Sequence, residues 1–292
     1  MRSECCNKTA SASQSHWRTT HANIIARRMT VKSYRTHAVL KIILLIIGIV
    51  CIAAVPFVSH AQSLSPLTTI PVRFVHTVKS NRVHAGEPVL ASTIQTVQLP
   101  DGQSIPKGSV LQGHIVEARP FVFDTTPYAI QQPSYLSIHF DKIILRNTSV
   151  PAQLYVRALV DNLDADKASS PIYLDETDRV GTRQLVGQDQ FSPLAKEVLN
   201  SDGDVVGYNR KDGVHARLIA NRYIVLHEFH DCPGTNTEQA VGIFSADACG
   251  IYGFVDVDLS NNGSDNNGTF KLESHHHSVT LQAGSAALLQ AF

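Results

Sequence analysis

The sequence predicts an all-β protein, mainly antiparallel, that forms a barrel or a sandwich with long loops and at most one or two short helices. Two observations predict this class. Short segments rich in β-branched and apolar residues recur through residues 69–160 and 202–292. Turn signals that contain proline and glycine separate these segments, and regularly spaced short strands and turns are typical of barrels and sandwiches.

Residues 1–61 have the character of a leader that ends in a signal peptide. They hold eight of the 25 Lys and Arg residues but only one of the 25 Asp and Glu residues, and an apolar run from Ile42 to Val58 follows Lys41. A basic start followed by an apolar run is typical of an export signal. Small residues at positions 59 and 61 predict cleavage between Ala61 and Gln62. The alternative is an uncleaved membrane anchor, for which the run is short.

The charge balance of the rest of the chain bears on its partners. Residues 62–292 carry the remaining 17 basic and 24 acidic residues. General nucleic-acid binding requires clustered positive charge, so this acidic balance argues against nucleic acid as a partner. We expect membrane contact only through the apolar segment, and only if it is not cleaved. The expected location is the periplasm or cell envelope, with secretion as the alternative.

The first predicted β domain covers residues 69–160. Its expected strands are residues 70–78, 89–99, 110–118, 136–145 and 154–160. Proline and glycine predict turns at 100–102 and 106–108, where proline presets one backbone angle and glycine permits a positive φ. The side chains in the most β-like segments are core candidates, and we expect at least two of these four to be buried: Phe74, Ile115, Val116 and Leu136.

The second half of the chain begins with a polar stretch. Residues 161–201 are expected to form an exposed loop with one short helix at Ser192–Leu199, where Ser192 can cap the helix and Pro193 can take its first position. Residues 202–292 predict a second β-rich segment that can complete the same barrel. The uncharged tail at 279–292 is expected to end as a buried strand, with Gly284 at a bend.

One hairpin in the first β domain carries a family resemblance. It reads G-x-x-I-P-K-G-S-x-L-x-G, formed by Gly102, Ile105, Pro106, Lys107, Gly108, Ser109, Leu111 and Gly113. Residues 69–160 thereby resemble the C-terminal β-barrel of TrbI-like conjugation proteins, which belong to the core complex of type IV secretion systems. The resemblance implies a β-barrel, a cell-envelope setting, and envelope or secretion-complex proteins as partners. It does not extend to residues 161–292.

Five cysteines are present, but only Cys232 and Cys249 follow the leader. A single pair of cysteines in an exported domain is typical of a disulfide. We therefore predict a disulfide between them.

The segment L-H-E-F-H-D-C offers a different chemistry. His227, Glu228, His230 and Asp231 are residue types that ligate metals, but their spacing matches no standard zinc pattern. On a strand, Glu228 and His230 would share one face and His227 would lie on the other. A solvated strand end beside a disulfide cysteine is the interpretation that we favour.

Two functional hypotheses follow. The first is an exported, non-catalytic β-protein of the cell envelope that acts by assembly or binding and needs no cofactor. It rests on the lack of a sequence motif that combines a nucleophile, acid or base with the structural setting that catalysis requires. The alternative is a secreted hydrolase or metal-dependent enzyme with its site near residues 227–252, where His, Glu, Asp and Cys concentrate.

Overall fold

The structure is a computed structural model that describes residues 64–100, 102–146, 148–173, 176, 179–225, 228–261 and 268–292. The predicted leader, the predicted cleavage site between Ala61 and Gln62, and His227 lie outside the described residues. Within the described ranges, no helix is long and apolar enough to cross a membrane.

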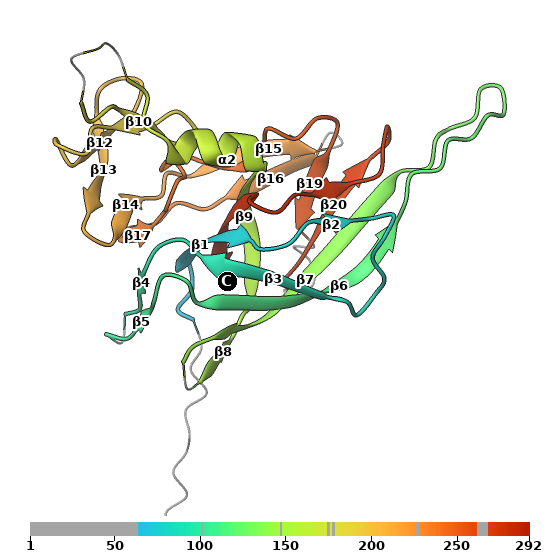
Figure 1. Ribbon diagram of the computed structural model, residues 1–292, viewed down its shortest axis with the longest axis horizontal. Coiled ribbons are helices and arrows are strands. Elements are labelled where there is room, and N and C mark those ends of the chain that lie inside the picture. The colour runs from blue at the N-terminus through green and yellow to red at the C-terminus, as the bar shows by residue number, and fades with distance from the viewer. Residues whose placement is uncertain are drawn as a thin grey trace, which may run out of the picture. The chain divides into compact units, whose positions relative to one another are not determined.

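A ten-stranded sheet curls into a nearly closed barrel (Figure 1), which confirms the predicted all-β class. All its strand pairs are antiparallel except the parallel pair β18–β9. The order is β18-β9-β22-β1-β3-β6-β7-β20-β19, with β8 paired to β7. The bounds are Gly250–Tyr252 (β18), Leu154–Val160 (β9), Ala286–Ala291 (β22), Thr69–Phe74 (β1), Pro88–Thr93 (β3), Val110–Arg119 (β6), Ser134–Ile144 (β7), Thr269–Ser274 (β20), Asp258–Asn261 (β19) and Ser149–Pro151 (β8).

A side chain replaces the missing strand pairing where the barrel nearly closes. The carboxamide of Asn261, at the end of β19, accepts from the backbone N–H of Val156 in β9 at 3.0 Å and donates to the carbonyl of the same residue at 2.8 Å. A carboxamide carries both a donor and an acceptor, as the backbone does. Asn261 therefore joins the two sides of the seam.

Alternating side chains of the large sheet fill the barrel core. Three of the four candidate core residues are buried, with exposed fractions of 1 % or less for Phe74, Ile115 and Leu136. Val116 is 42 % exposed, because it follows Ile115 on the strand and faces outward at a shift in the β6–β7 register. The ring of Phe140 stacks with the rings of both Phe74 and Phe270.

A second module is inserted between β9 and β18. It contains helix α2 (Asn162–Ser169), the hairpin β15–β16 and a six-stranded sheet of order β10-β11-β12-β13-β14-β17. The bounds are Arg183–Gln184 (β10), Gln190–Phe191 (β11), Glu197–Leu199 (β12), Val205–Arg210 (β13), Gly213–Arg217 (β14), Asn221–Val225 (β15), Glu228–Cys232 (β16) and Glu238–Ala240 (β17). Two further two-stranded sheets pair Val78–Lys79 (β2) with Thr280–Leu281 (β21) and Val97–Gln98 (β4) with Ser104–Ile105 (β5).

The predicted helix at 192–199 is wrong. Ser192 is followed by a single turn and then by β12, whose Val198 is fully buried in the second module. Pairing of β12 with β13 overrides the local capping signal. The helix lies instead at 162–169, in the stretch predicted to be a loop, where the Asp161 side chain caps it by accepting from the Asp164 N–H.

Strand β22 connects the two cores, because it is buried on both faces. Ala287 and Leu289 face the barrel core, whereas Ala286 and Leu288 face the core of the second module. The apolar tail thus ends as a buried strand, as predicted, and it fixes the module against the barrel wall.

Candidate functional site

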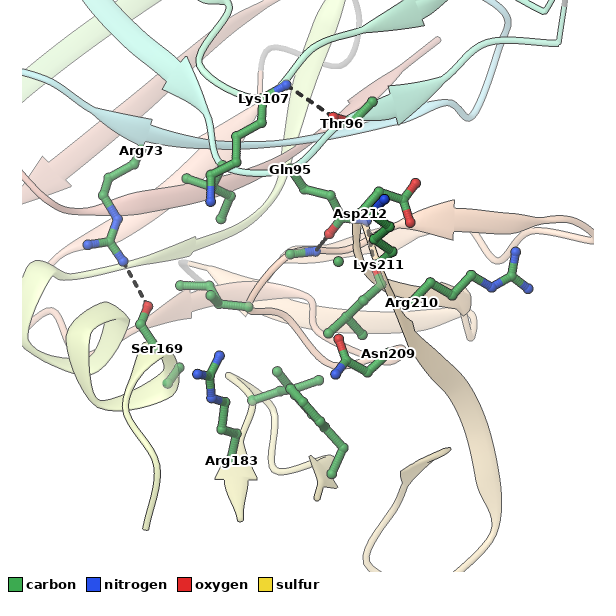
Figure 2. A pocket seen from close by; sticks show the side chains of 18 residues that line it. Arg73, Gln95, Thr96, Lys107, Ser169, Arg183, Asn209, Arg210, Lys211 and Asp212 are labelled. Atoms are coloured by element: carbon green, nitrogen blue, oxygen red, sulfur yellow. Dashed lines mark hydrogen bonds between the residues drawn. The ribbon is translucent and has the colours of Figure 1, made fainter. Parts of the chain in front are cut away.

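A cleft of about 690 Å³ opens between the barrel and the second module (Figure 2). The barrel contributes Arg73 of β1, the segment 94–96 that follows β3, and Lys107 in the turn that precedes β6. The module contributes the end of α2, Arg183 of β10 and the turn between β13 and β14. Its side chains therefore come from segments far apart in the sequence.

The cleft is strongly basic, although residues 62–292 are acidic on balance. Five cationic side chains and one acidic side chain, Asp212, line it. A concave surface of one sign focuses the potential and raises the local concentration of ions of opposite charge. The cationic side chains belong to Arg73, Lys107, Arg183, Arg210 and Lys211.

Two of these cations already have partners. The Arg73 guanidinium lies 2.9 Å from the Asp166 carboxylate and 3.0 Å from the Ser169 hydroxyl, and Arg210 pairs with Glu238. Among the described residues, no ion pair involves Lys107, Arg183 or Lys211. These three side chains therefore have charge that a ligand can neutralise.

Arg183 provides the strongest evidence that the cleft binds a ligand. Its Nε is buried and has no hydrogen-bond partner among the described residues. A buried donor without a partner costs about 1–3 kcal/mol. Figure 2 shows the tips of Arg183 and Lys107 directed toward each other from opposite sides of the cleft, while the Arg210 guanidinium points away. An anion between Arg183 and Lys107 would therefore meet both cations.

Part of the cleft lining is apolar, and Gln95 beside it has fixed partners. Ile94, Leu185 and Phe191 contribute to it. Beneath the β13–β14 turn, the Gln95 carboxamide donates to the Val214 carbonyl at 2.9 Å and accepts from the Gly242 N–H at 3.0 Å.

The β13–β14 turn brings Lys211 to the cleft. Arg210 pairs with Gly213, which leaves Lys211 and Asp212 as a two-residue loop. Gly213 has φ +127°, and a Cβ at this position would lie 2.5 Å from the Gln95 side chain. Only glycine satisfies both the backbone angle and the close approach.

Of the segment that offered candidate metal ligands, the described residues Glu228–Cys232 form β16. Glu228 is exposed, the His230 ring stacks on Tyr223 at 5.1 Å, and Asp231 lies 3.8 Å from the Arg222 Nε. Across the residues that the structure describes, no three His, Cys, Asp or Glu side chains come together as metal ligands. The described members of the predicted set thus have separate contacts, and His227 lies outside them.

The predicted disulfide between Cys232 and Cys249 is confirmed. It joins the end of β16 to the residue before β18, and a stable disulfide indicates an oxidising environment. A buried arginine stabilises the same region. The fully buried Arg157 of β9 donates to the carbonyls of Ile219, Pro233 and Ala248. Burial lowers the pKa of Arg157.

Sequence reasoning found the disulfide but missed both the cleft and Arg157. Of the cleft residues, only Lys107 had been singled out, as part of the hairpin that resembles TrbI-like proteins. A single arginine inside the apolar run L-Y-V-R-A-L-V was the one available signal for Arg157. No protein-family model, curated protein or solved structure matches this chain.

Proposed function

We propose that this chain is an exported protein of the cell envelope that acts by binding, and that the basic cleft binds an anionic ligand. The observation that carries the proposal is the convergence of Lys107 and Arg183, neither of which has an ion-pair partner among the described residues. The disulfide is consistent with export, because such bonds persist in oxidising compartments.

The cleft favours an organic anion over a bare polyanion. Its lining combines cationic and apolar side chains, so a ligand that carries both a carboxylate or phosphate and an apolar body would contact both kinds of surface. A cleft of about 690 Å³ lies within the range of small-molecule sites. Two cations on opposite sides would fix the acidic group, and the apolar side chains of the lining would contact the rest.

The carboxylate of Asp212 and the nearby imidazole of His215 both contact protein groups, which favours binding over catalysis in the cleft. Asp212 lies 3.2 Å from the Nε2 of His215, and that nitrogen also lies 3.1 Å from the Gln95 carboxamide. His215 is buried, so its Nε2 is directed at protein groups rather than at a ligand. The resemblance to TrbI-like proteins adds a cell-envelope setting, with secretion-complex proteins as the class of partner.

Calorimetric titration of the exported protein with phenyl phosphate, benzoate and inorganic phosphate tests this proposal. A charged hydrogen bond contributes about 1.5–3 kcal/mol, so Lys107→Gln combined with Arg183→Gln should weaken binding by about tenfold or more. Arg82→Gln combined with Lys142→Gln is the matched control, because it removes two exposed positive charges that do not line the cleft.

Two results would contradict the proposal. The first is the absence of binding for all three anions. The second is equal affinity of the cleft variant and the control. For the export part of the proposal, N-terminal sequencing of the exported protein should begin at Gln62, and a membrane-retained full-length chain would identify the apolar run as an anchor.

A further inference from the structure

A second hollow, of about 680 Å³, adjoins the basic cleft at the turn between β13 and β14. Three residues of this turn region, Asn209, Arg210 and Lys211, line both the cleft and the hollow. The remaining residues that line the hollow are Pro193, Lys196 and Tyr208. Because the two depressions share part of their lining, one ligand can extend from the cleft into the hollow.

The hollow is basic, like the cleft. Three of its six lining residues are cationic and none of the six is acidic. Arg210 pairs with Glu238, and Figure 2 shows its guanidinium directed away from the cleft. Across the part of the chain that the structure describes, no ion pair involves Lys196 or Lys211. The charge of these two lysines is therefore available to a ligand in the hollow.

The backbone of Lys196 is fixed in an unfavourable conformation. Its φ is +64°, in the left-handed region, where a residue other than glycine costs free energy. Its N–H donates to the Ser192 carbonyl at 3.2 Å, and its carbonyl accepts from the Asn209 N–H at 2.7 Å. Glycine would meet this backbone angle without strain, so the backbone alone does not account for a lysine at the rim of the hollow.

The hollow also presents an apolar surface beside its cations. The Tyr208 side chain is 42 % exposed, and Pro193 lies in the same lining. On β13, Tyr208 and Arg210 project from the same face, because side chains two positions apart on a strand share a face. The body of a ligand that crosses the β13–β14 turn would therefore contact an aromatic ring as well as positive charge.

We propose that the cleft and the hollow together bind one linear ligand that carries an acidic group at each end. One acidic group would lie between Lys107 and Arg183, and the other would lie beside Lys196. The middle of the ligand would cross the β13–β14 turn. This inference rests on the proposed anion binding by the cleft and adds the class of ligand, because an anion with a single acidic group in the cleft would leave Lys196 without a partner.

Calorimetric titration with hexyl phosphate and with hexane-α,ω-bisphosphate tests the inference, since the two probes differ only in the second phosphate. Once the first phosphate is bound in the cleft, the second contact is intramolecular. We therefore expect one bisphosphate per chain, bound about tenfold more tightly than hexyl phosphate. Propane and decane bisphosphates vary the span, and the gain should be lost when the ligand is too short to reach the hollow.

The ratio of the two affinities is the measurement to compare among variants. Lys196→Gln should remove most of the gain that the second phosphate provides, whereas Lys196→Arg keeps the positive charge and should retain it. Lys142→Gln is the matched control, because it removes an exposed positive charge that lines neither the cleft nor the hollow. Unchanged far-ultraviolet circular dichroism verifies that each variant is folded.

The outcomes separate this inference from the proposed function. If neither hexyl phosphate nor any bisphosphate binds, the anion-binding cleft is wrong and this inference fails with it. If hexyl phosphate binds but the second phosphate adds nothing at any length, only the linear ligand is wrong. A gain that Lys196→Gln retains, or two bisphosphates bound per chain, would also overturn the inference while leaving the cleft in place.

Discussion

The substitution Arg157→Met should destabilise the fold by several kcal/mol. The guanidinium is fully buried and donates to the carbonyls of Ile219 at 2.7 Å, Ala248 at 3.0 Å and Pro233. Methionine occupies similar space but donates no hydrogen bond. Each buried group that loses its partner costs about 1–3 kcal/mol, while removal of the buried charge returns part of its desolvation cost. The balance is a loss of about 3–5 kcal/mol.

Equilibrium unfolding in urea, followed by circular dichroism under oxidising conditions, measures this loss. Arg157→Lys should be intermediate, because an ammonium keeps the charge but cannot reproduce the planar fork of donors. Arg82→Met is the control for an exposed arginine and should change the free energy of unfolding by no more than about 0.5 kcal/mol. If the free energy of unfolding of Arg157→Met lies within about 1 kcal/mol of the wild-type value, the guanidinium does not hold these three segments together.

Three further predictions concern other parts of the fold. Replacing Cys232 and Cys249 by Ser removes a disulfide with a sequence separation of 17 and should cost roughly 3 kcal/mol in urea unfolding; a loss under about 1 kcal/mol would contradict this. Burial raises the pKa of the Asp189 carboxyl, so the native state binds its proton more tightly than the unfolded chain and stability falls as pH rises through the native pKa. Asp189→Asn should therefore be more stable than the wild type at pH 7 and lose that advantage below about pH 4, whereas a difference independent of pH would refute the assignment. Asn261→Ala should open the seam and speed hydrogen exchange at the Val156 amide, and unchanged exchange would show that the seam is held by other contacts.

The strands of the barrel could be predicted because their signal is local. Phe74 and Leu136 sit in alternating segments whose buried face is readable from a few neighbours, and turn residues bound each segment. Helix α2 was missed for the opposite reason. Its buried residues, Ala165 and Ala168, are small, so the sequence shows almost no apolar stripe at helical spacing.

The cleft could not be predicted, because it exists only after the module docks on the barrel. Lys107 and Arg183 are separated in the sequence by strands β6 to β9 and helix α2, and nothing near either residue signals the other. The overall acidic balance concealed a local basic surface. A net charge sums all residues, whereas the surface potential depends on which residues the fold brings together. Arg157 likewise gains its role from three loops that meet only in three dimensions.

The position of β22 between β1 and β9 has a kinetic consequence. The first strand of the described chain pairs with the last, Thr69 with Gln290, so the barrel wall cannot be completed until nearly all of the described chain has been synthesised. Contacts between such distant segments fold slowly, because a long loop must close before they form. During synthesis the chain therefore lacks the strand that joins both cores, and neither core is complete until β22 has paired with β1 and β9.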